Sequence, residues 1–241
     1  MSHEATKTRA IRGADFEKRY LQGRLIDIGC GEDLVADHAE AFDLAHGDAQ
    51  VIGRLRERGA YDAVCSSHCL EHMADVRNAL EQWWSLVRDG GYLVLVVPDE
   101  DLYEQGGWPS LFNKDHKATF RLGKQTSWSP VSFDIEELVR ALPGAVIVSC
   151  ELQDHQYDHQ LRKSSITRID RILFRFAQYW SSLCRHTGLS GTLWEGSVVR
   201  LLRKLGCPID QTDGPALAQI QVIARKRIVL STAVGESRGV E

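Results

Sequence analysis

The stretch LIDIGCGEDL, from Leu25 to Leu34, places an acid inside an apolar run and two glycines at the end of that run. The apolar run predicts a short buried strand, in which the carboxylate of Asp27 is costly unless it is hydrogen-bonded. Gly29 and Gly31 lack a Cβ, so they accept strained backbone angles and let a ligand approach the main chain closely. We therefore expect a strand that ends in a ligand-binding loop, with Asp27 bonded to the amides of that loop.

Two other interpretations of the glycine loop stay open. A dinucleotide-binding loop has the spacing G-x-G-x-x-G, but Leu34 occupies the third glycine position. This difference disfavours a nicotinamide-dependent oxidoreductase. The other alternative is a tight turn that binds nothing, because paired glycines also serve ordinary turns.

Strands and helices alternate along the rest of the chain. Strands are predicted at 41–44, 61–67, 92–98, 145–152 and 216–226, and helical patterns occur at 15–23, 34–42, 74–91 and 132–144. This alternation predicts a parallel α/β sheet, in which a ligand binds outside the carboxyl ends of the strands.

Composition and charge exclude several classes of protein. The net charge of the 241 residues is −4, so nothing indicates a nucleic-acid partner. The six cysteines are scattered and form no CxxC pair, which fits a reducing cytoplasm and gives no zinc motif. The sequence shows no signal peptide, and no apolar run approaches the ~20 residues that span a bilayer. We therefore expect a cytoplasmic protein.

Three motifs, in this order, resemble those of class I S-adenosylmethionine-dependent methyltransferases of the small-molecule type. IDIGCG (26–31) resembles the first motif of that family, and YDAVCSSHCLEHMAD (61–75) resembles its fourth-strand motif, which ends in Leu-Glu-His. SLVRDGGYLVLVVPD (85–99) resembles its Gly-Gly and fifth-strand motif. The resemblance implies a Rossmann-like α/β fold: a seven-stranded, mostly parallel sheet with helices on both faces and an antiparallel last strand.

The same resemblance implies one methyltransferase domain over residues 15–230. A helical insertion at about 155–212 precedes the last strand, where family members commonly have a short hairpin. Residues 1–14 and 231–241 are expected to be flexible ends.

The resemblance also implies S-adenosyl-L-methionine as the cofactor. The positions that match its binding residues are Asp27, Gly29, Cys30, Gly31, Asp43, Asp48, Ala49, Ser67 and His68. Asp27 is expected to favour the cationic amino group, Asp43 to bind the ribose hydroxyls, and Asp48 and Ala49 to lie beside adenine.

Two departures from the family pattern affect these assignments. Asp33 stands where the family often has a further glycine. The stretch between the first and fourth strands is short and lacks a full second helix or third strand. The roles of Asp43 and Asp48 therefore remain interchangeable, and Asp43 could be a surface acid.

The polar segment 99–117 follows the fifth strand and is expected to cover the site, since long loops in compact domains are usually functional. Its acids, Trp108 and Tyr103 suit a sugar acceptor. His116 is the candidate general base, oriented by Asp115 or Asp99, and His68 is a weaker alternative. The competing interpretation is that the sequence DHK around His116 simply caps the next element.

No metal site is predicted. The carboxylates at 99–104 are possible ligands for a divalent ion, but their spacing fixes no coordination geometry. His72 is interpreted as a structural residue packed near the cofactor.

The predicted insertion contains SSITRIDRILFRFAQYWSSLCR (164–185), which has one apolar face and an arginine-bearing face. Three interpretations remain open: a helix packed on the domain's own sheet or acting as a lid, a homodimer interface, and a helix that lies on a membrane surface.

The function expected from this resemblance is methyl transfer to a hydroxyl of a sugar or another small polar acceptor. The segment 98–120 also resembles methyltransferases of bacterial surface polysaccharide biosynthesis, which suggests a glycan acceptor. The alternatives are a catalytically inactive cofactor-binding scaffold and an N- or protein methyltransferase.

Overall fold

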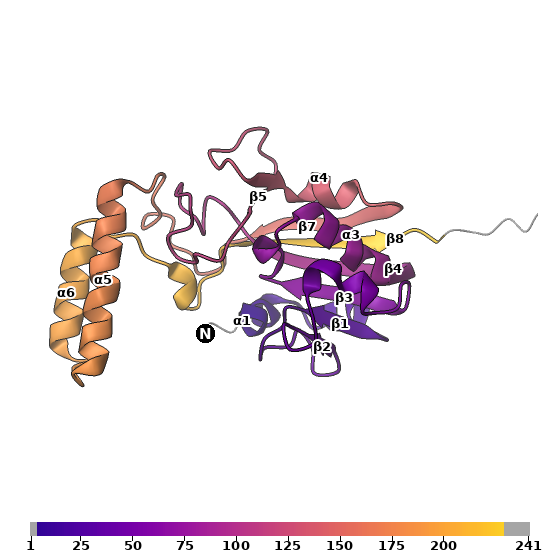
Figure 1. Ribbon diagram of the computed structural model, residues 1–241, viewed down its shortest axis with the longest axis horizontal. Coiled ribbons are helices and arrows are strands. Elements are labelled where there is room, and N and C mark those ends of the chain that lie inside the picture. Colours follow the sequence, from indigo (N-terminus) through magenta and orange to yellow (C-terminus); the bar gives the residue numbers. More distant parts are fainter. Residues whose placement is uncertain (1–3, 229–241) are drawn as a thin grey trace, which may run out of the picture.

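The computed structural model of the chain describes residues 4–228 and is built around a six-stranded sheet (Figure 1). In spatial order the strands are β2 (Glu40–Phe42), β1 (Leu25–Ile28), β3 (Tyr61–Ser67), β4 (Val87–Pro98), β8 (Gln219–Lys226) and β7 (Ala145–Gln153). β1 pairs in parallel with β2 and β3, and β3 pairs in parallel with β4. β8 lies antiparallel between β4 and β7. The mostly parallel α/β sheet with an antiparallel last strand is therefore confirmed.

The prediction of seven strands is wrong for the part of the chain that is described. Between β2 and β3 the chain forms only the 3-10 helix η1 (Ala49–Arg54). A parallel crossover with its own helix takes a dozen or more residues, so this short connection leaves no room for a helix and a further strand. β2 is consequently an edge strand.

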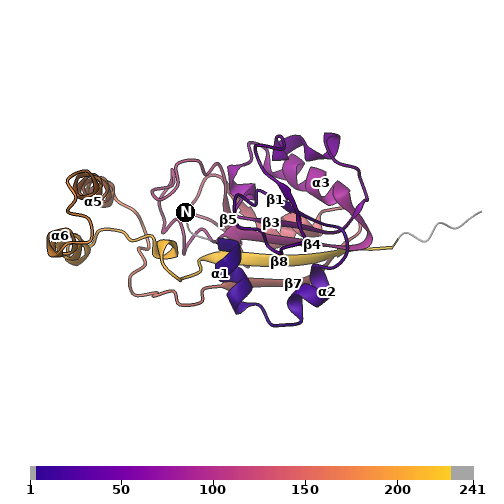
Figure 2. The ribbon, with the colours of Figure 1, turned by 90° about the horizontal axis from the view of Figure 1, so that it is seen from below.

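Helices cover both faces of the sheet, as Figure 2 shows. On one face lie α3 (Val76–Leu86) and α4 (Ile135–Arg140), which begin at the capping residues Asp75 and Asp134. The larger apolar core fills this side and includes the fully buried Trp83 of α3. On the other face, α2 (Phe16–Tyr20) packs with Leu21, Val35 and neighbouring residues in a smaller core.

The N-terminal segment is ordered from Glu4, contrary to the prediction of a flexible end over 1–14. Residues Glu4–Ile11 form helix α1, in which Thr8 is buried and accepts a hydrogen bond from Gln219 Nε2 at 2.8 Å. Lys7 Nζ donates to the carbonyl oxygen of Thr212 at 2.6 Å. The sequence of this helix lacks the apolar stripe that predicts a packed helix, and polar contacts hold it in place instead. The predicted tail at 231–241 lies outside the described residues.

The helical pattern at 34–42 is a second wrong prediction. Residues 30–39 form turns and bends between β1 and β2, and the buried Val35 and Ala36 pack against the sheet without forming a helix. The connection is too short to cross the sheet as a helix. The glycine loop is therefore not followed by a helix N-terminus that would attract an anion.

Between β7 and β8 the chain forms two long helices, α5 (Arg168–His186) and α6 (Leu193–Lys204), which extend away from the sheet (Figures 1 and 2). The side chains of Thr167 and Asp170 form a reciprocal capping box at the start of α5. The 3-10 helix η3 (Gln211–Asp213) then leads back to β8. Within the described residues, no helix is both long and apolar enough to cross a membrane.

Candidate functional site

A cavity of about 480 Å³ lies where β1 and β3 end and the connecting loops begin. Its lining residues are Glu4, Ala5, Asp27, Gly29, Cys30, Gly31, Glu32, Asp33, Ser67, His68, Glu71, His72, Tyr103, Phe112, Asn113, His116, Asp210, Thr212 and Asp213. The ends of parallel strands are where open α/β sheets bind their ligands. The predicted residues Asp27, Gly29, Cys30, Gly31, Ser67, His68 and His116 therefore meet in one cavity.

Asp27 is buried at the end of β1, and only one of its carboxylate oxygens is hydrogen-bonded. Oδ2 accepts from the amide of Val35 at 2.7 Å, whereas Oδ1 has no partner. Burial raises the pKa of Asp27 to about 7, against the opposing effects of the Val35 amide and the Arg12 charge. Arg12 also has a buried nitrogen, Nη1, without a partner. Asp27 is thus a carboxylate with one oxygen left for a ligand.

The backbone of the glycine loop requires glycine at its first position. Gly29 has φ +77°, and a Cβ there would lie 2.4 Å from Sγ of Cys69. Its amide donates to the carbonyl of Phe42 at 2.7 Å, which ties the loop to the end of β2. A side chain at position 29 would therefore clash with Cys69 in the loop after β3 and displace the glycine loop.

The three residues predicted for the ribose and adenine do not line the cavity. Asp43 follows β2, and its Oδ2 accepts from the amide of Gly31 at 2.9 Å, so it supports the glycine loop. Asp48 caps η1 by accepting from the amide of Gln50. The carbonyl of Ala49 accepts from Nε1 of Trp83. Their predicted contacts with the cofactor remain predictions.

His68 follows β3 with φ +53° and is held by a defined hydrogen-bond chain. Its Nε2 lies 3.0 Å from Oε1 of Gln219, whose amide nitrogen already donates to Thr8 and Gln153. Since that nitrogen is engaged, Oε1 is the acceptor and His68 Nε2 is the donor. Burial lowers the pKa of His68, but the nearby Glu71 carboxylate outweighs burial, so the net shift is upward.

His116 is buried beside the cavity and pairs with a residue that the sequence analysis missed. Its Nδ1 lies 2.6 Å from Oε1 of Glu104, and its ring lies over that of Tyr103 at a centroid distance of 5.1 Å. The predicted orienting residues were wrong. Asp115 is exposed and its amide donates to Oδ1 of Asn113, and Asp99 accepts from the amides of Asp101 and Leu102.

Glu71, from the Leu-Glu-His motif, is completely buried, and neither of its carboxylate oxygens has a hydrogen-bond partner. Three imidazoles surround it. Oε1 lies 3.6 Å from His68 Nδ1, 4.0 Å from His72 Nε2 and 3.9 Å from His116 Nε2. The only signal in the sequence was the Glu-His pair itself, because His116 lies on a different loop.

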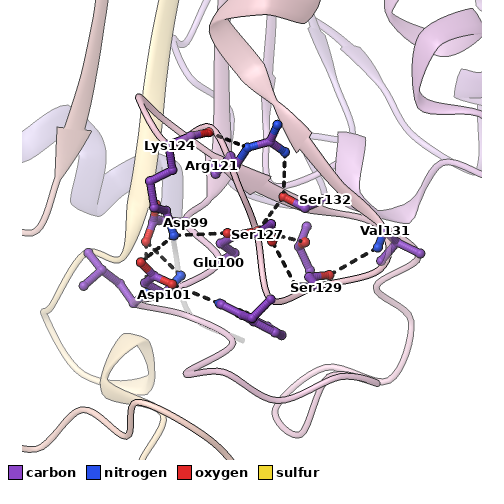
Figure 3. A network of polar contacts seen from close by, with 12 residues as sticks. Asp99, Glu100, Asp101, Arg121, Lys124, Ser127, Ser129, Val131 and Ser132 are labelled. Atoms are coloured by element: carbon purple, nitrogen blue, oxygen red, sulfur yellow. Dashed lines mark hydrogen bonds and ion pairs between the residues drawn. The ribbon is translucent and has the colours of Figure 1, made fainter.

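Asp99, Glu100 and Asp101 belong to a network of polar contacts that holds the loop in shape (Figure 3). None of the three lines the cavity. Glu100 is fully buried; its Oε2 accepts from Ser127 and Ser132, and its Oε1 pairs with Lys124. Asp101 also pairs with Lys124. Burial raises the pKa of Asp99 to about 6. The expectation that these acids contact a sugar is therefore not met by Asp99, Glu100 or Asp101.

Comparison with known families identifies the type of domain. Residues 8–190 match a family model described as a methyltransferase domain. The chain belongs to this methyltransferase family. A methyltransferase domain agrees with S-adenosyl-L-methionine, the cofactor that the resemblance of the three motifs implies.

The methyltransferase is also similar to several solved structures, all of low sequence identity. A SAM-dependent methyltransferase from Archaeoglobus fulgidus shares 16% identity, covers 93% of this chain and 95% of its own, and gives a TM-score of 0.48. The YcgJ protein from Bacillus subtilis shares 13%, with coverages of 95% and 99% and a TM-score of 0.46.

A third similar structure is a phosphoethanolamine N-methyltransferase from Haemonchus contortus. It shares 13% identity over 88% of this chain and 51% of its own, with a TM-score of 0.43. A search of curated proteins finds no significant match to the methyltransferase.

Two polar atoms of the cavity wall have no hydrogen-bond partner and could bind the cofactor. Asp27 Oδ1 and Ser67 Oγ are both buried and lack a hydrogen-bond partner, and both residues line the same cavity as the glycine loop. An ammonium group has three donors, which a carboxylate and a hydroxyl can accept. We conclude that the residues around Gly29 suit the amino-acid end of S-adenosyl-L-methionine.

Proposed function

We propose that this methyltransferase methylates a hydroxyl of a small polar acceptor, with sugars as the leading class. The observation that supports this most is the His116–Glu104 pair in the wall of the cofactor cavity, joined at 2.6 Å. A histidine held by a carboxylate at Nδ1 presents Nε2 as a proton acceptor, which is the arrangement that oxygen nucleophiles need. Sequence resemblance alone supports the further proposal of a cytoplasmic role in surface glycan biosynthesis.

In this proposal the bound S-adenosyl-L-methionine supplies an electrophilic methyl group. Asp27 and Ser67 hold the amino-acid end of the cofactor, and the loop at Gly29 shapes the backbone around it. His116 takes the acceptor's proton at Nε2, and Glu104 stabilises the resulting imidazolium. Alignment of the acceptor oxygen and exclusion of water account for the remainder of the catalysis.

The acceptor would lie between the aromatic and amide side chains of the loop. Tyr103 and Phe112 line the cavity with their rings 6.0 Å apart, and Asn113 is adjacent. Aromatic surface and an amide are common partners of sugar rings and hydroxyls. This part of the wall supports a sugar more directly than Asp99, Glu100 and Asp101 do.

A second candidate function is N-methylation of an amine. Five acids besides Asp27 and Glu71 line the cavity: Glu4, Glu32, Asp33, Asp210 and Asp213. Their negative charge would attract a cationic acceptor. His116 would then remove the proton from the ammonium before transfer.

The test is an acceptor panel with isotopically labelled S-adenosyl-L-methionine. Sugars, nucleotide sugars and small amines are offered separately, and labelled product is counted. Product with sugars alone supports the first proposal, and product with amines alone supports the second. Binding of S-adenosylhomocysteine without product from any class would favour the inactive scaffold. The control is Asp27→Ala, for which cofactor binding itself should be lost.

A further inference from the structure

Glu71, His72 and His116 bring three metal-binding atoms together at the cavity wall. One carboxylate oxygen and two imidazole nitrogens all lie within 4.8 Å of one another. Ligands bound at ~2.0–2.2 Å to one ion are separated by roughly 3–4 Å. The distances of 3.9 and 4.0 Å from Glu71 Oε1 to the two Nε2 atoms are close to that separation.

The hydrogen bonds of the two imidazoles fix which nitrogen each presents. His72 Nδ1 lies 3.3 Å from the carbonyl oxygen of Asp115, and His116 Nδ1 lies 2.6 Å from Glu104 Oε1. A carbonyl and a carboxylate only accept, so both Nδ1 atoms donate. In the neutral ring, Nε2 then carries a lone pair, and in both residues this nitrogen is the one near Glu71.

The cluster therefore gathers electron pairs around a carboxylate that has no donor. Glu71 is 0% exposed and lacks any hydrogen-bond partner on either oxygen. A buried charge without a partner is strongly unfavourable, so a cation belongs beside it. His68 Nδ1 also lies near this carboxylate, 3.6 Å from Oε1, while its Nε2 donates to Gln219. The cation is either a proton shared with an imidazole or a metal ion.

We propose that Glu71, His72 and His116 bind a divalent first-row transition-metal ion. Two imidazoles and one carboxylate form a ligand set that suits Zn²⁺, Fe²⁺, Mn²⁺ or Co²⁺, whereas Mg²⁺ and Ca²⁺ prefer oxygen ligands throughout. The Nδ1 contacts with Glu104 and with the carbonyl oxygen of Asp115 would hold the two imidazole rings in the orientation that points Nε2 at the ion. Neither the sequence motif nor the spacing of residues 99–104 indicated this site.

The ion would leave coordination positions open toward the cavity, and this role rests on the proposed function. An acceptor hydroxyl binds through an oxygen lone pair, the metal lowers the pKa of its O–H bond, and the proton leaves to water in the cavity. In this arrangement His116 binds the metal and is not the general base. The metal activates the acceptor oxygen in its place.

The test measures metal binding by the full chain without a polyhistidine tag, after removal of trace metal with a chelator. MnCl₂, CoCl₂ and ZnCl₂ are titrated separately by calorimetry, and the Co²⁺ complex is examined by visible absorption. We expect a single ion per chain. Glu71→Gln and His72→Ala should weaken binding by at least ~100-fold, and Glu104→Gln by about 10- to 100-fold. The matched control is His159→Ala, an exposed histidine paired with Asp154, and its binding should not change.

S-adenosylhomocysteine is titrated into the same samples, so that folding and the proposed function are checked separately. Normal binding of S-adenosylhomocysteine by Glu71→Gln shows that the variant is folded. Its loss of metal binding then has a local cause. If the wild-type chain binds the nucleoside but only traces of metal, the metal site is refuted and the cofactor site stands. Metal binding that Glu71→Gln retains also refutes the site. Metal binding without nucleoside binding would refute the proposed function alone.

Discussion

The sheet domain buries its large apolar side chains, whereas the α5–α6 pair exposes several of them. In the domain, Trp83 on α3 is 0% exposed and lies within the main core. On the helix pair, Ile169 is 68% exposed and Trp194 is 72% exposed. The family match ends at residue 190, between these two helices. Helical periodicity predicts that a helix forms, but it does not say whether a partner covers the apolar face.

The contacts of α5 bear on the three interpretations of this insertion. Phe174 packs against Phe112 with ring centroids 5.4 Å apart, and Arg171 donates to the carbonyl of Pro109. These contacts connect the helix to the loop over the cavity, and the helices extend away from the sheet. Packing on the domain's own sheet is therefore wrong. The lid, homodimer and membrane-surface interpretations remain proposals.

The largest expected effect lies in the domain core. Trp83→Ala should lower the free energy of unfolding by about 3–5 kcal/mol, because a fully buried aromatic side chain leaves a cavity. Urea unfolding followed by circular dichroism measures this. A loss below about 1 kcal/mol would show that this core is loosely packed, and the contrast with the helix pair would disappear.

The next effect concerns catalysis. His116→Ala should leave the affinity for S-adenosylhomocysteine unchanged and lower turnover of an active acceptor at least ~100-fold, the usual scale of base catalysis. Calorimetry and single-turnover assays measure the two quantities, with His159→Ala as the control. Unchanged turnover would remove His116 both as a base and as a functional metal ligand.

Asp27 gives the cofactor site a pH dependence. Its pKa is raised to about 7 by burial, so in the ligand-free protein it is mostly protonated at pH 6. Affinity for the ammonium of S-adenosylhomocysteine should fall about tenfold between pH 8 and pH 6. Asp27→Asn should bind weakly and show no such dependence, which separates Asp27 from the titration of nearby histidines. Calorimetry at four pH values tests this, and a wild-type affinity that does not change would contradict it.

The same group affects stability with a defined sign. The folded-state pKa lies above the unfolded value, so the native state holds more protons between about pH 4 and pH 7. Stability of the ligand-free protein due to this group should therefore decrease as pH rises through that window. Asp27→Asn should raise the free energy of unfolding at pH 8, by about 1–3 kcal/mol, because no buried charge remains. Denaturant unfolding at pH 8 without ligand measures the difference, and a destabilised variant would contradict it.

The smallest effect is expected on the helix pair. Ile169→Gln with Ile172→Gln should change the free energy of unfolding by less than about 0.5 kcal/mol for each substitution, because both side chains are exposed. A larger loss would mean that these side chains are covered in solution. Light scattering would then detect a dimer that the variant lacks, and sedimentation with anionic vesicles would test the membrane alternative.

The parts of the fold that the sequence predicted well are those encoded locally. The apolar runs predicted β3 at Tyr61–Ser67 and most of β4, and the helical spacing of apolar residues predicted α3. The helix ends at Leu86 and β4 begins at Val87, before the predicted helix end at Gly91. Helix α1 was missed because its contacts are polar and join residues far apart, such as Thr8 and Gln219. The six-stranded sheet differs from the expected seven because family resemblance, and not the length of the 43–60 connection, decided that count.

The site shows the same division. Asp27, Gly29 and His68 lie next to strands, so the order of motifs placed them correctly in one cavity. The partner of His116 was predicted from neighbours in the sequence, Asp99 and Asp115. Those acids instead bond to backbone amides near them or face solvent, and Glu104 reaches the imidazole across the loop. Side-chain pairing within a long loop depends on its folded path, which no local pattern encodes.

Helix α1 has a practical consequence for anyone who expresses this protein. Glu4 and Ala5 line the cofactor cavity, and Lys7 donates to the carbonyl oxygens of Gly214 and of Thr212, which also lines the cavity. A purification tag fused ahead of Glu4 would therefore begin at the mouth of the cavity, and a start codon chosen downstream would delete one of its walls.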